Sequence, residues 1–207
     1  MKRILLAAAF SFTPALLFAE TEFVLKKIEP TLVESPTIQS NYRKSSTGRP
    51  SHWLEIEVTL DRSSSDKDAE AVSGDVTFQY YLLLNNSAIT EDGKRTLLTG
   101  KVAHSDFPLE KGLHVAAFVS PQTLLKYFDG KPPTTIQQAV VDAGVVATSG
   151  SESPEPLSWK SKISSGKGWW DDTSTFNVVE GKIVGKSQTP FAHLASDYHQ
   201  PDLPASR

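Results

Sequence analysis

The chain contains no cysteine and only one methionine among its 207 residues. The absence of cysteine excludes disulfide bridges, thiol nucleophiles, iron–sulfur clusters and zinc sites built on thiolates. An excess of one charge sign is also lacking, because 21 Lys and Arg stand against 24 Asp and Glu. No basic field is therefore present to attract nucleic acid or anionic lipid. With 39% hydrophobic and 22% charged residues, the composition is that of a globular domain. It names no chemistry, and no cofactor is predicted.

The first apolar run has the pattern of an export signal. Two basic residues precede the apolar stretch 4–12, and Ala19 supplies a small residue at the cleavage point. An N-terminal anchor helix is the alternative, but Pro14 interrupts the run, which is shorter than the roughly 20 apolar residues that a spanning helix needs. We expect residues 1–19 to be removed as a signal peptide. The mature chain, 20–207, then has no transmembrane segment and is secreted, periplasmic or at the surface of a Gram-negative-type bacterium.

Alternating hydrophobic residues predict several β-strands. The clearest is 53–60, in which the apolar residues occupy every second position. The serine- and acid-rich stretch 61–75 is predicted to be an exposed loop, and 76–84 a central strand. Further strands are expected at 96–103, 113–119 and 157–164. A hairpin is expected between 176–180 and 182–185, turning near Glu180 and Gly181.

One short helix is predicted at 121–129. Ser120 is a good N-cap, Pro121 suits the first helical position, and Gly130 can close the end. Its packing face would consist of Leu124, Leu125 and Phe128. The stretch 135–148 fits either a helix or a strand; we favour a strand because it holds four valines and Gly144 would weaken a helix.

Many short strands with turn signals between them, and no alternation of strands with helices, predict an all-β antiparallel sandwich with one short helix and no disulfide. We expect a single domain over 20–207, with a C-terminal appendage from about 165 to 207.

A catalytic site is not indicated by any motif. His193, Asp197 and His199 are the weak candidates for a metal site, and with it a metal-dependent hydrolase, but the spacing matches no zinc motif. The catalytic site is therefore predicted to be absent, and the protein not to be an enzyme.

The most suggestive local feature is the aromatic and acidic stretch Trp169, Trp170, Asp171 and Asp172, in a glycine-rich context. These four residues are the candidate binding residues. The indoles could anchor a protein interface, where Trp is enriched. Alternatively, they could stack on sugar rings in a carbohydrate-binding module, or one could fill the core while the other covers its rim. Self-association through open strand edges is a further possibility.

The segment 185–194, centred on Thr189, Pro190 and Phe191, together with Trp169 and Trp170, resembles a group of exported proteins from Verrucomicrobia, the phylum that includes Akkermansia. The resemblance implies an immunoglobulin-like fold, a link to type IV pilus-related surface proteins, and a non-catalytic role exerted through protein–protein contacts. The chain lacks the paired cysteines that bridge the two sheets of antibody domains.

Overall fold

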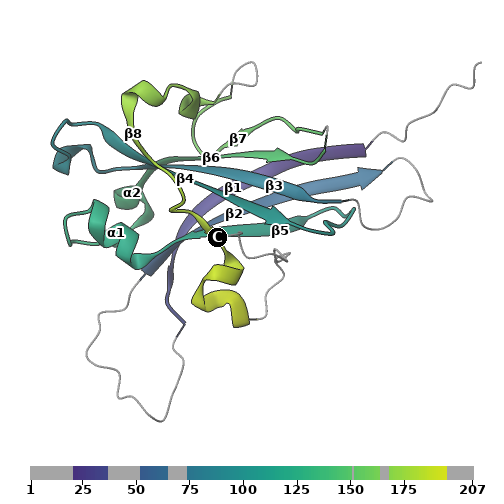
Figure 1. Cartoon of the computed structure of the whole chain (residues 1–207), viewed down its shortest axis with the longest axis horizontal. Helices are drawn as coiled ribbons and strands as arrows, with labels where there is room; N and C mark the ends of the chain where they lie inside the picture. The colour runs from purple at the N-terminus through teal and green to yellow at the C-terminus, as the bar shows by residue number, and fades with distance from the viewer. Residues whose placement is uncertain (1–20, 37–51, 65–73, 151, 164–167, 195–207) are drawn as a thin grey trace, which may run out of the picture.

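The computed structural model describes residues 21–36, 52–64, 74–150, 152–163 and 168–194, which form two β-sheets packed face to face (Figure 1). The first sheet has the strand order β1 (Thr21–Glu34), β2 (His52–Ser64), β5 (Leu113–Val119) and β9 (Val184–Gly185). The second has the order β7 (Leu157–Ser158), β6 (Val140–Thr148), β3 (Val76–Leu84), β4 (Arg95–His104) and β8 (Phe176–Val179). The all-β sandwich predicted from the sequence is confirmed. The predicted signal peptide lies outside the described residues.

The core between the sheets is made by the alternating rows that the sequence predicted. Every second residue of β2 from Leu54 to Leu60 is buried, and the same holds for β3 from Val76 to Leu84. Because successive side chains of a strand point to opposite faces, the intervening residues form the outer faces of the two sheets. The outer face of the second sheet carries the candidate site described below.

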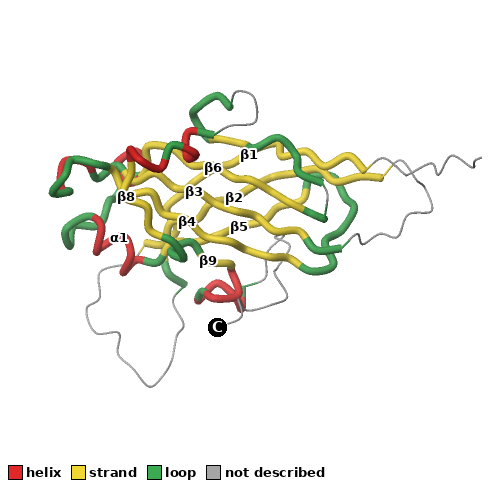
Figure 2. The backbone as a smooth tube through the Cα atoms, turned by 45° about the horizontal axis from the view of Figure 1, so that its top comes forward, coloured by secondary structure: helices red, strands yellow, loops and turns green. Residues whose placement is uncertain are grey.

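The helices are short; some lie at one end of the strands and others on the outer faces of the sheets (Figure 2). They are α1 (Pro121–Tyr127), α2 (Ile136–Ala139) and the 3-10 helices η1 (Ser87–Ile89), η2 (Trp169–Asp171), η3 (Thr173–Thr175), η4 (Lys186–Gln188) and η5 (Pro190–His193). The predicted start of α1 is confirmed, since the Ser120 hydroxyl accepts a hydrogen bond from the Thr123 backbone at 3.2 Å. Leu124 is buried, but Leu125 is 39% exposed, so its predicted place on the packing face is wrong. In the described part of the chain, no helix has the length and apolar character required to span a bilayer.

Strand β1 is the longest of the described strands and was not predicted. Its pairing with β2 contains a β-bulge between Leu25 and Lys27. The bulge moves the inward-facing positions out of phase, so that Phe23 and Leu25 are buried before it and Ile28 after it. Pro30 also lies within the strand, at the edge of the sheet where a missing backbone donor is tolerated. Together these features hide the regular alternation.

Three predicted boundaries are wrong for identifiable reasons. Strand β2 runs on to Ser64, into the predicted loop 61–75, because Arg62 continues the inward row and its guanidinium contacts Ser149 at 2.9 Å. In the ambiguous stretch 135–148 the first residues form α2, capped by Thr135, and the strand begins at Val140. The predicted strand 157–164 is reduced to Leu157–Ser158.

The predicted hairpin between 176–180 and 182–185 does not form. Strand β8 pairs with β4, in parallel, and β9 pairs with β5 in the other sheet. Gly181, whose φ of +68° suits a glycine, stands at the turn, and the Lys182 backbone donates to the Thr99 carbonyl at 3.1 Å. This crossover, residues 180–185, therefore ties one edge of the second sheet to one edge of the first.

We expect Gly100→Ala to destabilise the protein, by about 2 kcal/mol, a typical cost of overpacking. A β-carbon at Gly100 would overlap the carbonyl of Ile183, a backbone group of the crossover that cannot rotate away. Chemical denaturation measures the loss, and faster amide hydrogen exchange at residues 180–185 would place it at the crossover. Unchanged stability with unchanged exchange would show that the two backbones are not in close contact.

Candidate functional site

Trp170 is packed flat against the outer face of the second sheet. Only 3% of it is exposed, and its indole stacks on the Tyr81 ring with a centroid distance of 4.8 Å and an angle of 8°. Tyr81 on β3 lies opposite Gly144 on β6, and a β-carbon at Gly144 would overlap the indole. The glycine therefore leaves the space that Trp170 occupies beside Tyr81.

Trp169 is half-buried and connects the same cluster to a buried acid. Its Nε1 donates to the Ser158 hydroxyl at 3.0 Å, and that hydroxyl donates to Asp142 at 3.1 Å. The Trp169 ring also meets Phe176 of β8 edge-on, at 6.0 Å. Both tryptophans thus take part in a small hydrophobic cluster on the outer face, which fixes η2 to strands β3, β6 and β8.

Asp171 and Asp172, the other two candidate binding residues, are exposed at the end of η2. One carboxylate oxygen of Asp171 accepts a hydrogen bond from the Gly168 backbone at 3.0 Å. Asp172 accepts from the Ser174 hydroxyl at 2.7 Å. Both acids therefore have local structural partners that shape the segment around Trp170.

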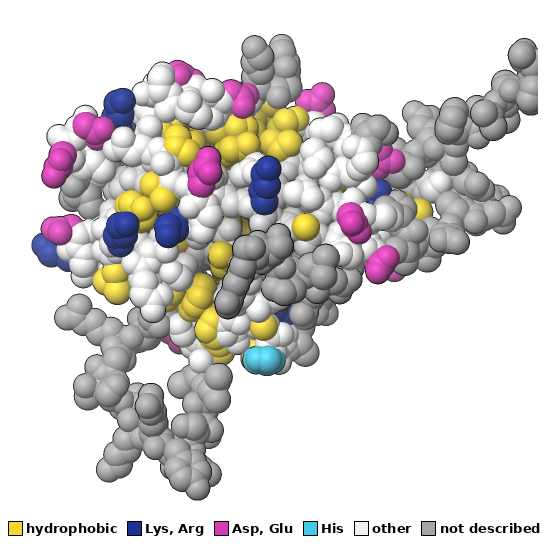
Figure 3. Space-filling view, viewed as in Figure 1, with side chains coloured by type: hydrophobic (Ala, Val, Ile, Leu, Met, Phe, Trp, Pro, Cys, Tyr) yellow, Lys and Arg dark blue, Asp and Glu magenta, His cyan; other side chains and the backbone are white. Residues whose placement is uncertain are grey.

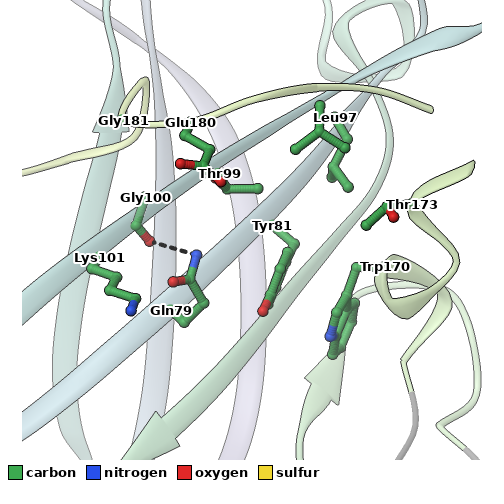
Figure 4. A pocket seen from close by; sticks show the side chains of 11 residues that line it. Gln79, Tyr81, Leu97, Thr99, Gly100, Lys101, Trp170, Thr173, Glu180 and Gly181 are labelled. Atoms are coloured by element: carbon green, nitrogen blue, oxygen red, sulfur yellow. Dashed lines mark hydrogen bonds between the residues drawn. The ribbon is translucent and has the colours of Figure 1, made fainter.

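A groove of about 540 Å³ lies beside the Tyr81–Trp170 stack (Figure 4). Thr99 and Gly100 of β4 line its floor, and Glu180 lies across it from the two aromatic rings. The residues that line the groove come from β3, β4, η2, η3, β8 and the crossover 180–185: Gln79, Tyr81, Leu97, Thr99, Gly100, Lys101, Trp170, Thr173, Val178, Glu180 and Gly181. We call this the β8 groove. It brings together residues from Gln79 to Gly181, which are far apart in the sequence.

Lys101 and Glu180 give the β8 groove one exposed charge of each sign. The Gln79 amide donates to the Tyr80 and Gly100 carbonyls, both at 3.3 Å. Partial burial, and secondarily the nearby Asp171 carboxylate, raises the pKa of the Tyr81 phenol. The neutral hydroxyl can donate a hydrogen bond. The groove thus offers aromatic edges, neutral polar groups and two opposite charges.

Strand β8 is held in place from one side by the turn that precedes β4. The Asn177 amide donates to Asp92 at 3.1 Å, and Lys94 donates to the Ser174 carbonyl at 3.1 Å. The Lys94 backbone N–H, and secondarily the Asn177 amide, holds the pKa of Asp92 below its usual range. The strand is therefore anchored, although Val178 within it is 41% exposed.

A second hollow, of about 430 Å³, lies on the other side of the aromatic stack. Tyr81 and Trp170 line both hollows, and Asp171 and the Ser153–Pro156 segment complete the second one. Figure 3 shows hydrophobic side chains gathered on this part of the surface, over β6 and β8, with a basic and an acidic side chain beside them. The stack is thus a ridge between two depressions.

The candidate metal residues are only partly described by the structure. His193 is exposed on η5, while Asp197 and His199 lie outside the described residues. Among the residues that are described, no three histidine or acidic side chains are grouped so as to hold a metal ion.

The segment that carries the sequence resemblance covers the outer face of the first sheet. Phe191 stacks on Phe118 of β5, with a centroid distance of 5.1 Å and an angle of 15°, and meets Trp53 edge-on at 5.8 Å. The Thr189 hydroxyl accepts from the Phe191 backbone at 3.1 Å and so starts η5. The segment that carries the resemblance is therefore a structural part of the domain, since Phe191 packs against the outer face of the first sheet.

The sequence did not indicate the β8 groove. Tyr81 and Lys101 fall within the predicted strands 76–84 and 96–103, and Val178 falls within the first arm of the predicted hairpin, so no pattern distinguishes them. Gly144 was the available signal, since a glycine inside a strand often marks the close approach of another group.

A protein-family model matches residues 17–203. Among solved structures, a protein from Akkermansia muciniphila is similar with a TM-score of 0.71 and 17% sequence identity, over 91% of this chain and 95% of that chain. This agrees with the sequence resemblance to proteins of Verrucomicrobia and, at such low identity, concerns the fold alone. No curated protein matches the chain.

Proposed function

We propose that this chain, which belongs to the family whose model matches residues 17–203, is an exported, non-catalytic protein that binds a protein partner at the β8 groove. The observation that carries the proposal is the groove itself, in which the Tyr81–Trp170 stack faces Glu180 across the surface of the second sheet. Clusters of aromatic residues that combine apolar area with polar tips are typical of protein interfaces.

A protein partner fits the geometry better than a carbohydrate. Sugar-binding platforms present a flat aromatic face to the ligand, whereas Trp170 is almost completely buried and one face of its ring is covered by Tyr81. The groove also combines an exposed aliphatic side chain, Val178, with Lys101 and Glu180. Peptides carry aliphatic, basic and acidic side chains together, so they can complement all three groups.

A non-catalytic role is supported by the chemistry of the groove. Its ionisable side chains are Tyr81, Lys101 and Glu180. Burial raises the pKa of the Tyr81 phenol, and its hydroxyl can donate a hydrogen bond to a partner. Lys101 and Glu180 form no ion pair with each other within the described residues. We therefore assign these groups to recognition.

The predicted signal peptide supports the proposed place of action. The proposal includes removal of the signal peptide 1–19 and action in the periplasm or at the cell surface. The link to type IV pilus-related surface proteins, which the sequence resemblance implies, makes a pilus or envelope component the partner to look for first.

Charge reversal in the groove tests the proposal. We expect the double variant Lys101→Glu/Glu180→Lys to capture its partner from an envelope extract of the native organism at least tenfold less efficiently than the wild type. Both side chains are exposed and make no ion pair in the described structure, so folding should be unaffected. Quantitative mass spectrometry of the captured proteins gives the readout.

Lys131→Glu/Glu110→Lys is the matched control, because both side chains are also exposed but lie outside the groove. Its capture should equal that of the wild type. Equal capture by the groove variant would contradict the proposed site. Retention of polysaccharide instead of protein would favour the carbohydrate-binding alternative.

A further inference from the structure

Strand β8 has a free edge beside the β8 groove. It is the last strand of the second sheet and pairs only with β4. The Phe176 N–H at its start donates to the Thr173 carbonyl of η3, and among the described residues no other backbone group of β8 is hydrogen-bonded outside that pair. In a parallel pair, alternate backbone N–H and C=O groups of an edge strand point away from the neighbouring strand. This edge can therefore accept another strand.

The other edge strands are protected or blocked. Strand β1 has a bulge, Pro30 and the exposed Lys26 and Lys27, which are the usual means of preventing strand addition. Strand β9 contains two residues and continues directly into η4. Strand β7 also contains only two residues. Strand β8 combines four residues, no proline, no lysine and an exposed valine.

We infer that β8 accepts an extended segment of the partner protein as an additional strand of the second sheet. The inference rests on the proposed function and names the form in which the partner binds. Main-chain hydrogen bonds along the edge would supply affinity, and alternate side chains would supply specificity. Because β8 is anchored through Asn177 to Asp92, its edge is fixed before the partner arrives.

The outer face of β8 specifies the chemistry of the incoming strand. Val178 points to the same face as Leu97, its partner on β4, and Glu180 follows two residues later on the same face of the groove. Residues directly opposite one another on neighbouring strands interact most strongly. The segment should therefore place an aliphatic side chain beside Val178 and, two residues away, a lysine or arginine beside Glu180.

A library of random nine-residue peptides displayed on phage tests this inference. We expect enriched peptides to contain an aliphatic and a basic residue two positions apart, without proline between them. Their binding should slow amide hydrogen exchange in residues 176–179. We expect Val178→Asp to lower their affinity at least tenfold.

Leu125→Asp is the matched control, since Leu125 is 39% exposed and Val178 is 41% exposed. Its affinity for the peptides should equal that of the wild type. Failure to enrich any peptide, binding without slower exchange in β8, or equal affinity of the Val178→Asp variant would overturn strand addition. Slower exchange in β8 that depends on protein concentration without peptide would identify a second copy as the occupant and would also overturn it.

These outcomes are separable from the failure of the proposed function. Suppose that capture depends on Lys101 and Glu180 but amide exchange in β8 is not slowed. The groove would then remain the binding site, and only strand addition at β8 would be rejected. If capture does not depend on Lys101 and Glu180 and β8 is not protected, the groove is also rejected as the binding site.

Discussion

Trp170→Ala should lower the free energy of unfolding by about 4 kcal/mol, a cost typical of removing a buried tryptophan. The indole contacts Tyr81, covers Gly144 and meets Trp169 edge-on at 5.3 Å, so its removal leaves a cavity lined by three elements. For a chain of this size the melting temperature should fall by about 10 °C. Denaturant titration, followed by fluorescence of the remaining tryptophans, measures the loss.

Trp169→Ala is the matched control and should cost about 1–2 kcal/mol, since that side chain is half-buried and makes one hydrogen bond to Ser158. Equal costs for the two variants would show that the neighbouring tryptophans do not have the different roles described here. A Trp170→Ala variant as stable as the wild type would place the indole outside the packed cluster. Because Tyr81 loses its support, we also expect Trp170→Ala to weaken partner binding even where the variant remains folded.

Asp142→Asn should be almost as harmful as Asp142→Ala, with a loss of about 3 kcal/mol in each case. The carboxylate of Asp142 is buried, and each of its oxygens accepts from a backbone N–H. One accepts from Ala143 at 2.8 Å and Lys160 at 3.0 Å, the other from Ser161 at 3.1 Å. The hydroxyls of Ser158 and Ser161 also donate to the second oxygen. An asparagine has only one acceptor oxygen, so either orientation sets its NH₂ group against a backbone donor.

Asp172→Asn makes the same chemical change at an exposed position, where the side chain has one partner, Ser174. Its stability should stay within about 0.5 kcal/mol of the wild type. Thermal unfolding of the three variants gives the comparison. An Asp142→Asn variant as stable as Asp172→Asn would contradict the hydrogen bonds by which Asp142 holds the segment 158–161 against β6. It would also contradict the role of this segment in supporting Trp169 through Ser158.

The strands that could be predicted are those whose pattern is set by a single buried face. Residues 53–60 alternate because one side of the strand faces the core. In 76–84 every second residue faces the core, while Tyr81 and Leu83 belong to the cluster on the outer face. Both strands were located from the sequence. Strand β1 could not be located in this way, because the bulge after Leu25 changes the inward-facing positions within one element. Which residues of β1 face the core can be assigned only once its pairing with β2, including the bulge, is known.

The end of the chain shows a different limit. Residues 176–185 have the local pattern of a hairpin, with Gly181 at the turn, but the two arms pair with strands of different sheets. A local pattern identifies extended backbone but not its partner. The choice depends on β4 and β5, which lie far away in the sequence and each present an edge to one arm.

The candidate site was located in part. Trp169 and Trp170 were singled out as aromatic residues in a glycine-rich stretch, and both lie in the cluster beside the groove. The groove itself depends on Tyr81, Lys101 and Glu180, which the fold brings together from three separate segments. Each of them alone is an ordinary strand or turn residue, so no local pattern distinguishes it.

Site-specific cross-linking tests most directly whether a protein partner binds at the β8 groove. Val178 or, in a control protein, Leu125 is replaced by a benzophenone-bearing residue, and each purified protein is irradiated in an envelope extract of the native organism. We expect one defined protein adduct from position 178 and none from position 125. No adduct at position 178, or the same adducts at both positions, would contradict it.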